Sequence, residues 1–389
     1  MSAPLSIVQM FDRPFREVER RLGRLMRLGV THVLVSPPQA SNPATQWWGR
    51  YQPVDFRVIA GPLGDGEDLR RLCASAARRG MAVLADAVLN HMTNHPRWIT
   101  VKGGAVVASR LARFGPSHFR RRPPRAGRHW LPELRTEDPY VQAELASYLA
   151  SLMSLGVSGF RFDAAKHIAP SFFARVLAQL RPGLSFCEHV HGHADEMPSA
   201  TLEHMQALDF AYARTLSEAF APGGDLRALV DPEARGDALP GPRSIRFANL
   251  HDLARRRRAF APFRHADLRD RRLAHIPILA GLHGTPHVYA PDLRYAEVKA
   301  GLRFRRAVGY ATQRFVLATP GTLLWTRGTR ALAGINKTGA AWRPGPLPVG
   351  LEDGLYRDLL TRGHHIVRGG HWLTAELGPR SACLLVRES

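Results

Sequence analysis

The stretch that decides the fold is GFRFDAAKH, residues 159–167. Its apolar part, in which Phe160 and Phe162 alternate, ends abruptly in polar residues at Asp163. This pattern is typical of the carboxyl end of a buried parallel strand that delivers side chains into a site. A helix that begins with Asp163 as its N-cap is the alternative interpretation.

Outward from this stretch, short apolar runs alternate with longer amphipathic segments, which indicates repeated βα units. Strands are expected at 6–11, 31–38, 81–91, 157–164, 184–190, 207–212, 244–252 and 276–290. Eight strands alternating with helices predict a (β/α)8 TIM barrel in the α/β class.

Three changes in sequence texture divide the chain. The barrel is expected over 1–91 and 138–308, interrupted by a segment rich in proline and arginine at 92–137. That segment is too long for an ordinary βα loop and predicts a short inserted subdomain after the third strand. Residues 315–389 consist of short alternating runs between glycine, proline and asparagine turns, which predicts a C-terminal all-β sandwich domain.

The composition excludes several classes of protein. No apolar run approaches the ~20 residues of a membrane span, and no signal peptide is recognised, so a cytoplasmic location is expected unless a leader has been removed. Three cysteines among 389 residues do not form a disulfide framework. The net charge of +21 is carried mainly by arginine, in clusters without interleaved aromatic residues. We therefore expect a solvated basic surface and no nucleic-acid partner, with a functional contact to a polyanion as the alternative. A monomer and no membrane partner are also expected.

The candidate catalytic residues are sought at the carboxyl ends of the predicted strands, because catalytic groups in such barrels lie there. Asp163 follows the fourth strand, Glu188 the fifth and Asp252 the seventh. Three carboxylates from three strands would converge on one cavity. Glycoside hydrolases use two such carboxyl groups, one as the nucleophile and the other as the proton donor.

Four segments resemble, in order, the short motifs of the alpha-amylase family, glycoside hydrolase family 13. They are DAVLNH at 86–91, GFRFDAAKH at 159–167, FCEHV at 186–190 and FANLHD at 247–252. Residues 36–58 are similar to the family's aromatic loop after the second strand, and the C-terminal module is similar to its β-sandwich. The resemblance implies a retaining hydrolase of α-1,4-glucosidic bonds in starch-like α-glucans or maltooligosaccharides.

The resemblance also implies roles for single residues. Asp163 would be the nucleophile, Glu188 the general acid and base, and Asp252 the residue that stabilises the oxocarbenium-like transition state. Glu188 needs a raised pKa, which the apolar neighbours Phe186 and Cys187 would favour by desolvation. The substrate-binding residues would be Trp47, Trp48, Tyr51, Gln52, His91, Arg161, Lys166, His167 and His251.

The family's calcium site is only partly matched. Asn90 and the main-chain carbonyl of His167 fit it, whereas Glu133 stands where the family has aspartate. Chloride is not expected, because Leu250 and His287 replace two of the side chains that surround the anion in chloride-activated members.

Other functions are compatible with parts of the pattern. The sequence EHVHGH places His189, His191 and His193 at alternating positions that could face a metal, as in a metal-dependent hydrolase. An α-glucan transglycosylase would use the same carboxylates with a sugar as the acceptor. A non-catalytic carbohydrate-binding relative would keep the fold without the reaction.

Overall fold

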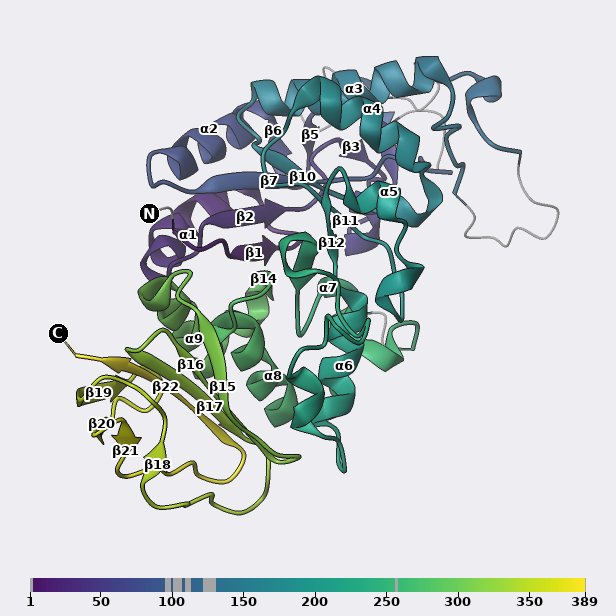
Figure 1. Ribbon diagram of the computed structural model, residues 1–389. Coiled ribbons are helices and arrows are strands. Elements are labelled where there is room, and N and C mark those ends of the chain that lie inside the picture. The colour runs from purple at the N-terminus through teal and green to yellow at the C-terminus, as the bar shows by residue number, and fades with distance from the viewer. Residues whose placement is uncertain are drawn as a thin grey trace.

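The computed structural model describes residues 3–94, 99–100, 107–108, 113–121, 131–255 and 258–388 (Figure 1). Its centre is a closed barrel of eight parallel strands in the order β1-β14-β13-β12-β11-β10-β7-β2. The predicted (β/α)8 fold is therefore confirmed. The barrel strands are β1 (Ile7–Met10), β2 (His32–Val35), β7 (Ala82–Ala87), β10 (Gly159–Phe162), β11 (Phe186–Cys187), β12 (Gln206–Leu208), β13 (Ser244–Arg246) and β14 (Thr285–Tyr289).

The helices surround the barrel and cover its apolar outer face. In α1, Val18, Leu22 and Leu25 recur at helical spacing and are buried, and Gly29 ends the helix with a left-handed φ of 92°. No described helix is long and apolar enough to span a membrane. The helices are α1 (Phe15–Leu28), α2 (Gly66–Ala77), α3 (Pro139–Ser154), α4 (Pro170–Leu180), α5 (Ser199–Leu202), α6 (Phe210–Phe220), α7 (His251–Arg255), α8 (Leu268–Ala280) and α9 (Ala296–Val308).

Three predicted strands extend into what are helices in the structure, since residues 251 and 252 of the strand predicted at 244–252 begin α7. Residues 276–280 complete α8 before strand β14, and residues 210–212 begin α6 after strand β12. In α8, every residue from Leu273 to Ala280 is buried, because the helix packs between β14 and the C-terminal sheet. A helix that is buried all round has no polar face, so its periodicity cannot be distinguished from that of a strand.

Short elements connect the barrel to the site. They include β3 (Ala40–Ser41), β4 (Pro53–Asp55), β5 (Ala60–Gly61), β6 (Gly64–Asp65) and, in the expected insertion, β8 (Ile99–Thr100) and β9 (Val107–Ala108). The aromatic loop forms a 3-10 helix over Trp47–Tyr51. Half of the segment at 92–137 lies outside the described residues, so the predicted subdomain stays a prediction.

The C-terminal module is an eight-stranded antiparallel sheet in the order β15-β16-β17-β22-β19-β20-β21-β18. Figure 1 shows it beside α8 and α9. Arg327 Nη1 and Trp325 Nε1 both donate to the carbonyl of Ala280, at 2.7 and 3.3 Å, and so attach the sheet to the end of α8. The strands are β15 (Gln313–Ala318), β16 (Thr322–Arg327), β17 (Ala331–Asn336), β18 (Leu347–Pro348), β19 (Gly354–Asp358), β20 (His364–Arg368), β21 (His371–Trp372) and β22 (Ser381–Arg387).

The three cysteines, Cys73, Cys187 and Cys383, are buried and unpaired. The expectation that they form no disulfide framework agrees with the structure.

Candidate active site

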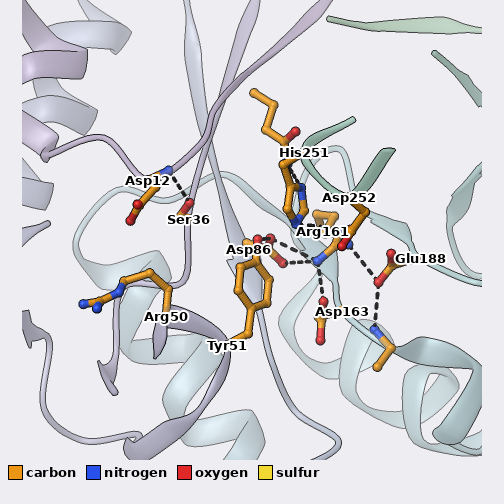
Figure 2. A network of polar contacts seen from close by, with 12 residues as sticks. Asp12, Ser36, Arg50, Tyr51, Asp86, Arg161, Asp163, Glu188, His251 and Asp252 are labelled. Atoms are coloured by element: carbon orange, nitrogen blue, oxygen red, sulfur yellow. Dashed lines mark hydrogen bonds and ion pairs between the residues drawn. The ribbon is translucent and has the colours of Figure 1, made fainter. Parts of the chain in front are cut away.

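A buried guanidinium lies at the centre of the site. Arg161 on β10 is 2% exposed, and its Nη1 lies 2.8 Å from Asp86 Oδ1 and 2.7 Å from Asp163 Oδ1. Its Nη2 lies 2.8 Å from Glu188 Oε2. Figure 2 shows these three carboxylates around the one side chain. We call Arg161, Asp86, Asp163 and Glu188 the acid cluster.

Strand geometry explains why these groups meet. Side chains two residues apart point to the same face of a strand, so Arg161 and Asp163 both face the barrel interior. Arg161 is paired in register with Asp86 on the neighbouring strand β7, and Glu188 follows β11 on the other side. The acid cluster therefore comes from the adjacent carboxyl ends of three parallel strands.

The chain turns sharply after Asp163, but this residue does not cap a helix. Its N–H donates to the carbonyl of Ala87 at 3.0 Å, which continues the strand pairing. Ala164 then takes a left-handed conformation with φ of 48°, and no side chain caps the 3-10 turn that follows. The alternative interpretation of GFRFDAAKH as a helix start is therefore wrong.

Burial raises the pKa of Glu188, and the attraction of Arg161 opposes this effect. The charge of Asp163 and a hydrogen bond between the two carboxyl groups raise the pKa further, while a hydrogen bond from the Ala164 N–H lowers it. Phe186 and Cys187, the apolar neighbours named from the sequence, are fully buried. The direction is the one that a general acid requires.

Asp86 is a member of the cluster that the sequence-based set of site residues lacks. It is 1% exposed, contacts Arg161 and accepts a hydrogen bond from the Tyr51 hydroxyl at 2.8 Å. Burial raises the pKa of Asp86 to about 7, against the opposing charge of Arg161. Its position as the first residue of DAVLNH was the signal that could have identified it.

His251 and Asp252 begin α7, after the seventh barrel strand. His251 Nε2 lies 3.1 Å from Asp252 Oδ2, and the other ring nitrogen, Nδ1, lies 2.9 Å from Gln9 Nε2. The imidazole stacks on Phe11 at a centroid distance of 4.1 Å, and the nearly parallel ring of Tyr51 lies beside both, 5.4 Å from His251 and 6.2 Å from Phe11. Gln9 and Phe11 on and after β1 were not identified from the sequence.

One cavity of about 800 Å³ gathers the three carboxylates of the sequence analysis, Asp163, Glu188 and Asp252. Its volume falls within the ~300–1,000 Å³ of typical ligand pockets. The lining residues are Asn42, Trp47, Trp48, Tyr51, Gln52, His91, Asn94, Leu131, Asp163, Ala164, Glu188, His251 and Asp252.

Comparisons with known proteins agree with this geometry. The family model for the alpha amylase catalytic domain matches residues 16–105. An alpha-amylase from Aeromonas hydrophila is 29% identical over 406 residues, which cover 86% of this chain and 85% of that protein. Another, from Streptomyces violaceus, is 31% identical over 72% of this chain and 51% of its own length.

The chain belongs to the alpha-amylase family. It is a glycoside hydrolase of the alpha-amylase type. The structure of alpha-amylase I from Eisenia fetida in a complex with maltohexaose has the same fold, with a TM-score of 0.85 and 19% identity over 100% of this chain and 98% of that one.

Some of the other sequence-predicted residues of this alpha-amylase-family site line the cavity, and others lie outside its lining. The indole of Trp47 packs against Tyr51 at a centroid distance of 6.0 Å, whereas Trp48 is 40% exposed at the cavity. Lys166 and His167 are exposed on the turn after Asp163 and are not among the residues that line the cavity. Arg161 does not line the cavity itself, but it contacts Asp163 and Glu188, which do.

Hydrogen bonds hold the polar side chains of the aromatic loop and of the loop after β7 in place. Gln52 Oε1 accepts from Asn42 Nδ2 at 2.7 Å, and His91 Nε2 lies 2.9 Å from the Tyr51 carbonyl. These contacts attach the aromatic loop to the end of β7 and fix the orientation of Tyr51.

The histidines of EHVHGH do not surround a metal site. His191 Nδ1 contacts the His189 carbonyl at 2.7 Å, while the exposed His193 pairs with Asp195 at 2.8 Å. Within the described ranges, no group of three or more histidine, cysteine, aspartate or glutamate side chains could hold a metal ion. The arrangement expected of a metal-dependent hydrolase is therefore not found in the part of the chain that the structure describes.

The two residues that the resemblance places at the anion site of chloride-activated members are both buried. Leu250 is apolar and 2% exposed, and His287 is 2% exposed. Burial, with the charge of Arg161, lowers the pKa of His287 to about 3, so this imidazole is neutral at ordinary pH. Chloride independence stays a prediction that these residues favour.

Proposed function

We propose that the chain cleaves α-1,4-glucosidic bonds of starch-like glucans or maltooligosaccharides with retention of the anomeric configuration. The convergence of Asp163, Glu188 and Asp252 on one cavity beside Trp47 and Trp48 carries this proposal. Asp163 attacks the anomeric carbon, Glu188 protonates the leaving oxygen and later activates water, and Asp252 stabilises the positive charge of the transition state.

The closeness of two carboxyl groups supports retention. Inverting enzymes leave ~6.5–9.5 Å between their carboxyl groups to accommodate a water molecule, whereas retaining enzymes leave only ~5–5.5 Å. Here Asp163 and Glu188 contact the two terminal nitrogens of one guanidinium, Nη1 at 2.7 Å and Nη2 at 2.8 Å. This spacing favours direct attack by Asp163 over attack by a water molecule held between them.

The environment of each group fits its proposed role. Nη1 of Arg161 keeps Asp163 directed at the cavity, and the raised pKa of Glu188 retains the proton that the leaving group needs. Aromatic rings such as those of Tyr51 and Trp48 offer apolar faces on which sugar rings stack. His91 and Gln52 supply polar groups at the same wall.

The test is to incubate the protein with maltohexaose and follow the anomeric protons by NMR during the first turnovers. We expect the α-anomer to appear first and the β-anomer to follow by mutarotation. The Asp163→Asn variant, prepared in parallel, gives the background rate. Initial formation of the β-anomer would contradict retention, and products longer than the donor would assign the chain to the transglycosylases instead.

We also propose a calcium ion held by Asn90 Oδ1, the His167 carbonyl and the Glu133 carboxylate. The carboxamide oxygen of Asn90 is buried and has no hydrogen-bond partner among the described residues, which fits an oxygen ligand for a hard cation. The main chain of Glu133 bridges to His91, next to Asn90. The ion would join the inserted segment to the barrel.

Chelation should therefore lower the melting temperature. A ligand present at about 100 times its Kd stabilises a protein by ~2.7 kcal/mol, and EDTA removes that contribution. Differential scanning calorimetry should show recovery with calcium but not with magnesium, and Asn90→Leu should abolish the difference. Equal melting temperatures in EDTA and in calcium would contradict this site.

A further inference from the structure

The imidazole of His251 is confined to one plane with its two nitrogens facing different partners. Phe11 stacks on the ring at an interplanar angle of 18°, and the ring of Tyr51, inclined by 17° to the imidazole, lies beside this pair, 6.2 Å from the centre of Phe11. The ring edge therefore presents Nδ1 to Gln9 on β1 and Nε2 to Asp252 on α7. Because a neutral histidine carries one proton, its partners decide which nitrogen donates.

Gln9 is a buried polar residue inside the barrel, 3% exposed. Its amide nitrogen lies 2.9 Å from His251 Nδ1, so the amide donates and Nδ1 accepts. The proton of the neutral ring then lies on Nε2, directed at Asp252 Oδ2 at 3.1 Å. With the amide reversed, a neutral ring would carry its proton on Nδ1, and the Nε2 lone pair would face the Asp252 carboxylate.

The opposite end of the same amide supports a role beyond packing. Gln9 Oε1 is buried without a hydrogen-bond partner among the described residues. An unsatisfied buried acceptor is unfavourable, and an apolar side chain of similar length would avoid it. Gln9 and Asp252, on opposite sides of the ring, favour the same tautomer.

We propose that Gln9 is a positioning residue that keeps His251 as the Nε2–H tautomer. The inference rests on the proposed function, because the Nε2–H group would donate to a sugar hydroxyl or to Asp252 inside the cavity. His251 then remains a hydrogen-bond donor, and Asp252 keeps its acceptor oxygens directed at the substrate. Gln9 does not line the cavity and acts through the ring.

The charged and titratable groups near the ring come from several elements. They include Asp252 on α7, Tyr51 on the aromatic loop and Arg255, whose guanidinium carbon lies 5.1 Å from the centre of the Phe11 ring. Because these neighbours are unchanged in a Gln9 variant, a difference in the state of His251 reports on the Gln9 amide.

Two substitutions separate positioning from packing. Gln9→Met keeps the length of the side chain without the hydrogen bond, and Gln9→Glu offers only acceptor oxygens, which require a proton on Nδ1. Gln206→Met is the matched control, because Gln206 on β12 also has a buried side-chain oxygen without a hydrogen-bond partner among the described residues, donates from Nε2 to the Pro242 carbonyl at 2.7 Å and does not line the cavity.

Nitrogen-15 NMR of histidine-labelled protein measures the tautomer directly, with the His251 signals assigned by their loss in His251→Asn. We expect the Nε2–H pattern in the parent and in Gln206→Met, a tautomeric mixture in Gln9→Met, and a doubly protonated ring in Gln9→Glu at neutral pH. Gln9→Met should also lower kcat/KM about tenfold, the scale of one hydrogen bond.

The outcomes are separable. A pure Nε2–H signal and parental kcat/KM in Gln9→Met, or a neutral ring in Gln9→Glu, would overturn the inference. Loss of kcat/KM with an unchanged tautomer, or an equal loss in Gln206→Met, would mean that Gln9 only packs. If the parent had no activity on glucans, the proposed function would fail, but the NMR comparison would still decide the tautomer.

Discussion

Glu188→Gln is expected to lower kcat on starch by about 10²–10⁴-fold, the range that a positioned general acid and base contributes. Glutamine keeps the size of the side chain and can still accept from the Ala164 N–H, but its amide has no acidic proton that it could transfer to the leaving oxygen. Because burial raises the pKa of Glu188, the parent should lose activity as the pH rises through this pKa. The variant should lack that alkaline limb.

The measurement is initial rate against pH for both proteins. Glu203→Gln is the matched control, because Glu203 is exposed after the short helix α5 and does not line the cavity. It should keep the parental rate and pH profile. Equal turnover by Glu188→Gln and the parent would end the assignment of Glu188 as the catalytic acid.

Arg161→Met is expected to lower the free energy of unfolding by about 3–5 kcal/mol, because removal of one partner leaves buried charges uncompensated. Asp86, Asp163 and Glu188 would lose their common cation. Arg161→Lys restores a charge but not the two nitrogens that reach the three carboxylates at once. It should recover only part of the stability and little of the activity.

The destabilisation should depend on pH in a defined direction. Burial already raises the pKa of Asp86 to about 7 and also raises that of Glu188, and loss of Arg161 raises both further. A carboxyl group whose pKa is higher in the folded state than in the unfolded state contributes stability that is lost as the pH rises. Arg161→Met should therefore differ from the parent more at pH 8 than at pH 5.

Urea unfolding at the two pH values measures this difference. Arg175→Met is a suitable control, since Arg175 is exposed on α4, and changes of that kind usually stay within about 0.5 kcal/mol. A pH-independent loss of stability in Arg161→Met would indicate that packing of the long side chain, and not its charge, stabilises the barrel here.

The parts of the site that could be predicted are those that depend on local order along the chain. Asp163 and Glu188 directly follow buried strands, and parallel strands of a barrel bring their carboxyl ends together. The side of the strand on which Arg161 lies follows from the two-residue alternation. These regularities predicted both the barrel and the meeting of the carboxylates.

What could not be predicted depends on contacts between distant segments. Gln9 and His251 are 242 positions apart, and no local pattern pairs them. Lys166 and His167 follow the left-handed Ala164, whose turn leads them away from the cavity, and a sequence does not reveal such a turn at an alanine. The helical end of α8 was missed because burial on all sides removed its periodicity.

The shared guanidinium has a consequence for the two stages of the proposed reaction. When Asp163 forms an ester with the sugar, it no longer carries a negative charge, and Arg161 is then balanced by fewer anions. Glu188 has just released its proton and faces Nη2 as an anion. The negative charge of Asp163, which had repelled Glu188 and paired with the same guanidinium, is then gone. The affinity of Glu188 for its proton thus falls when a base is needed and returns when the ester is hydrolysed, without movement of the main chain.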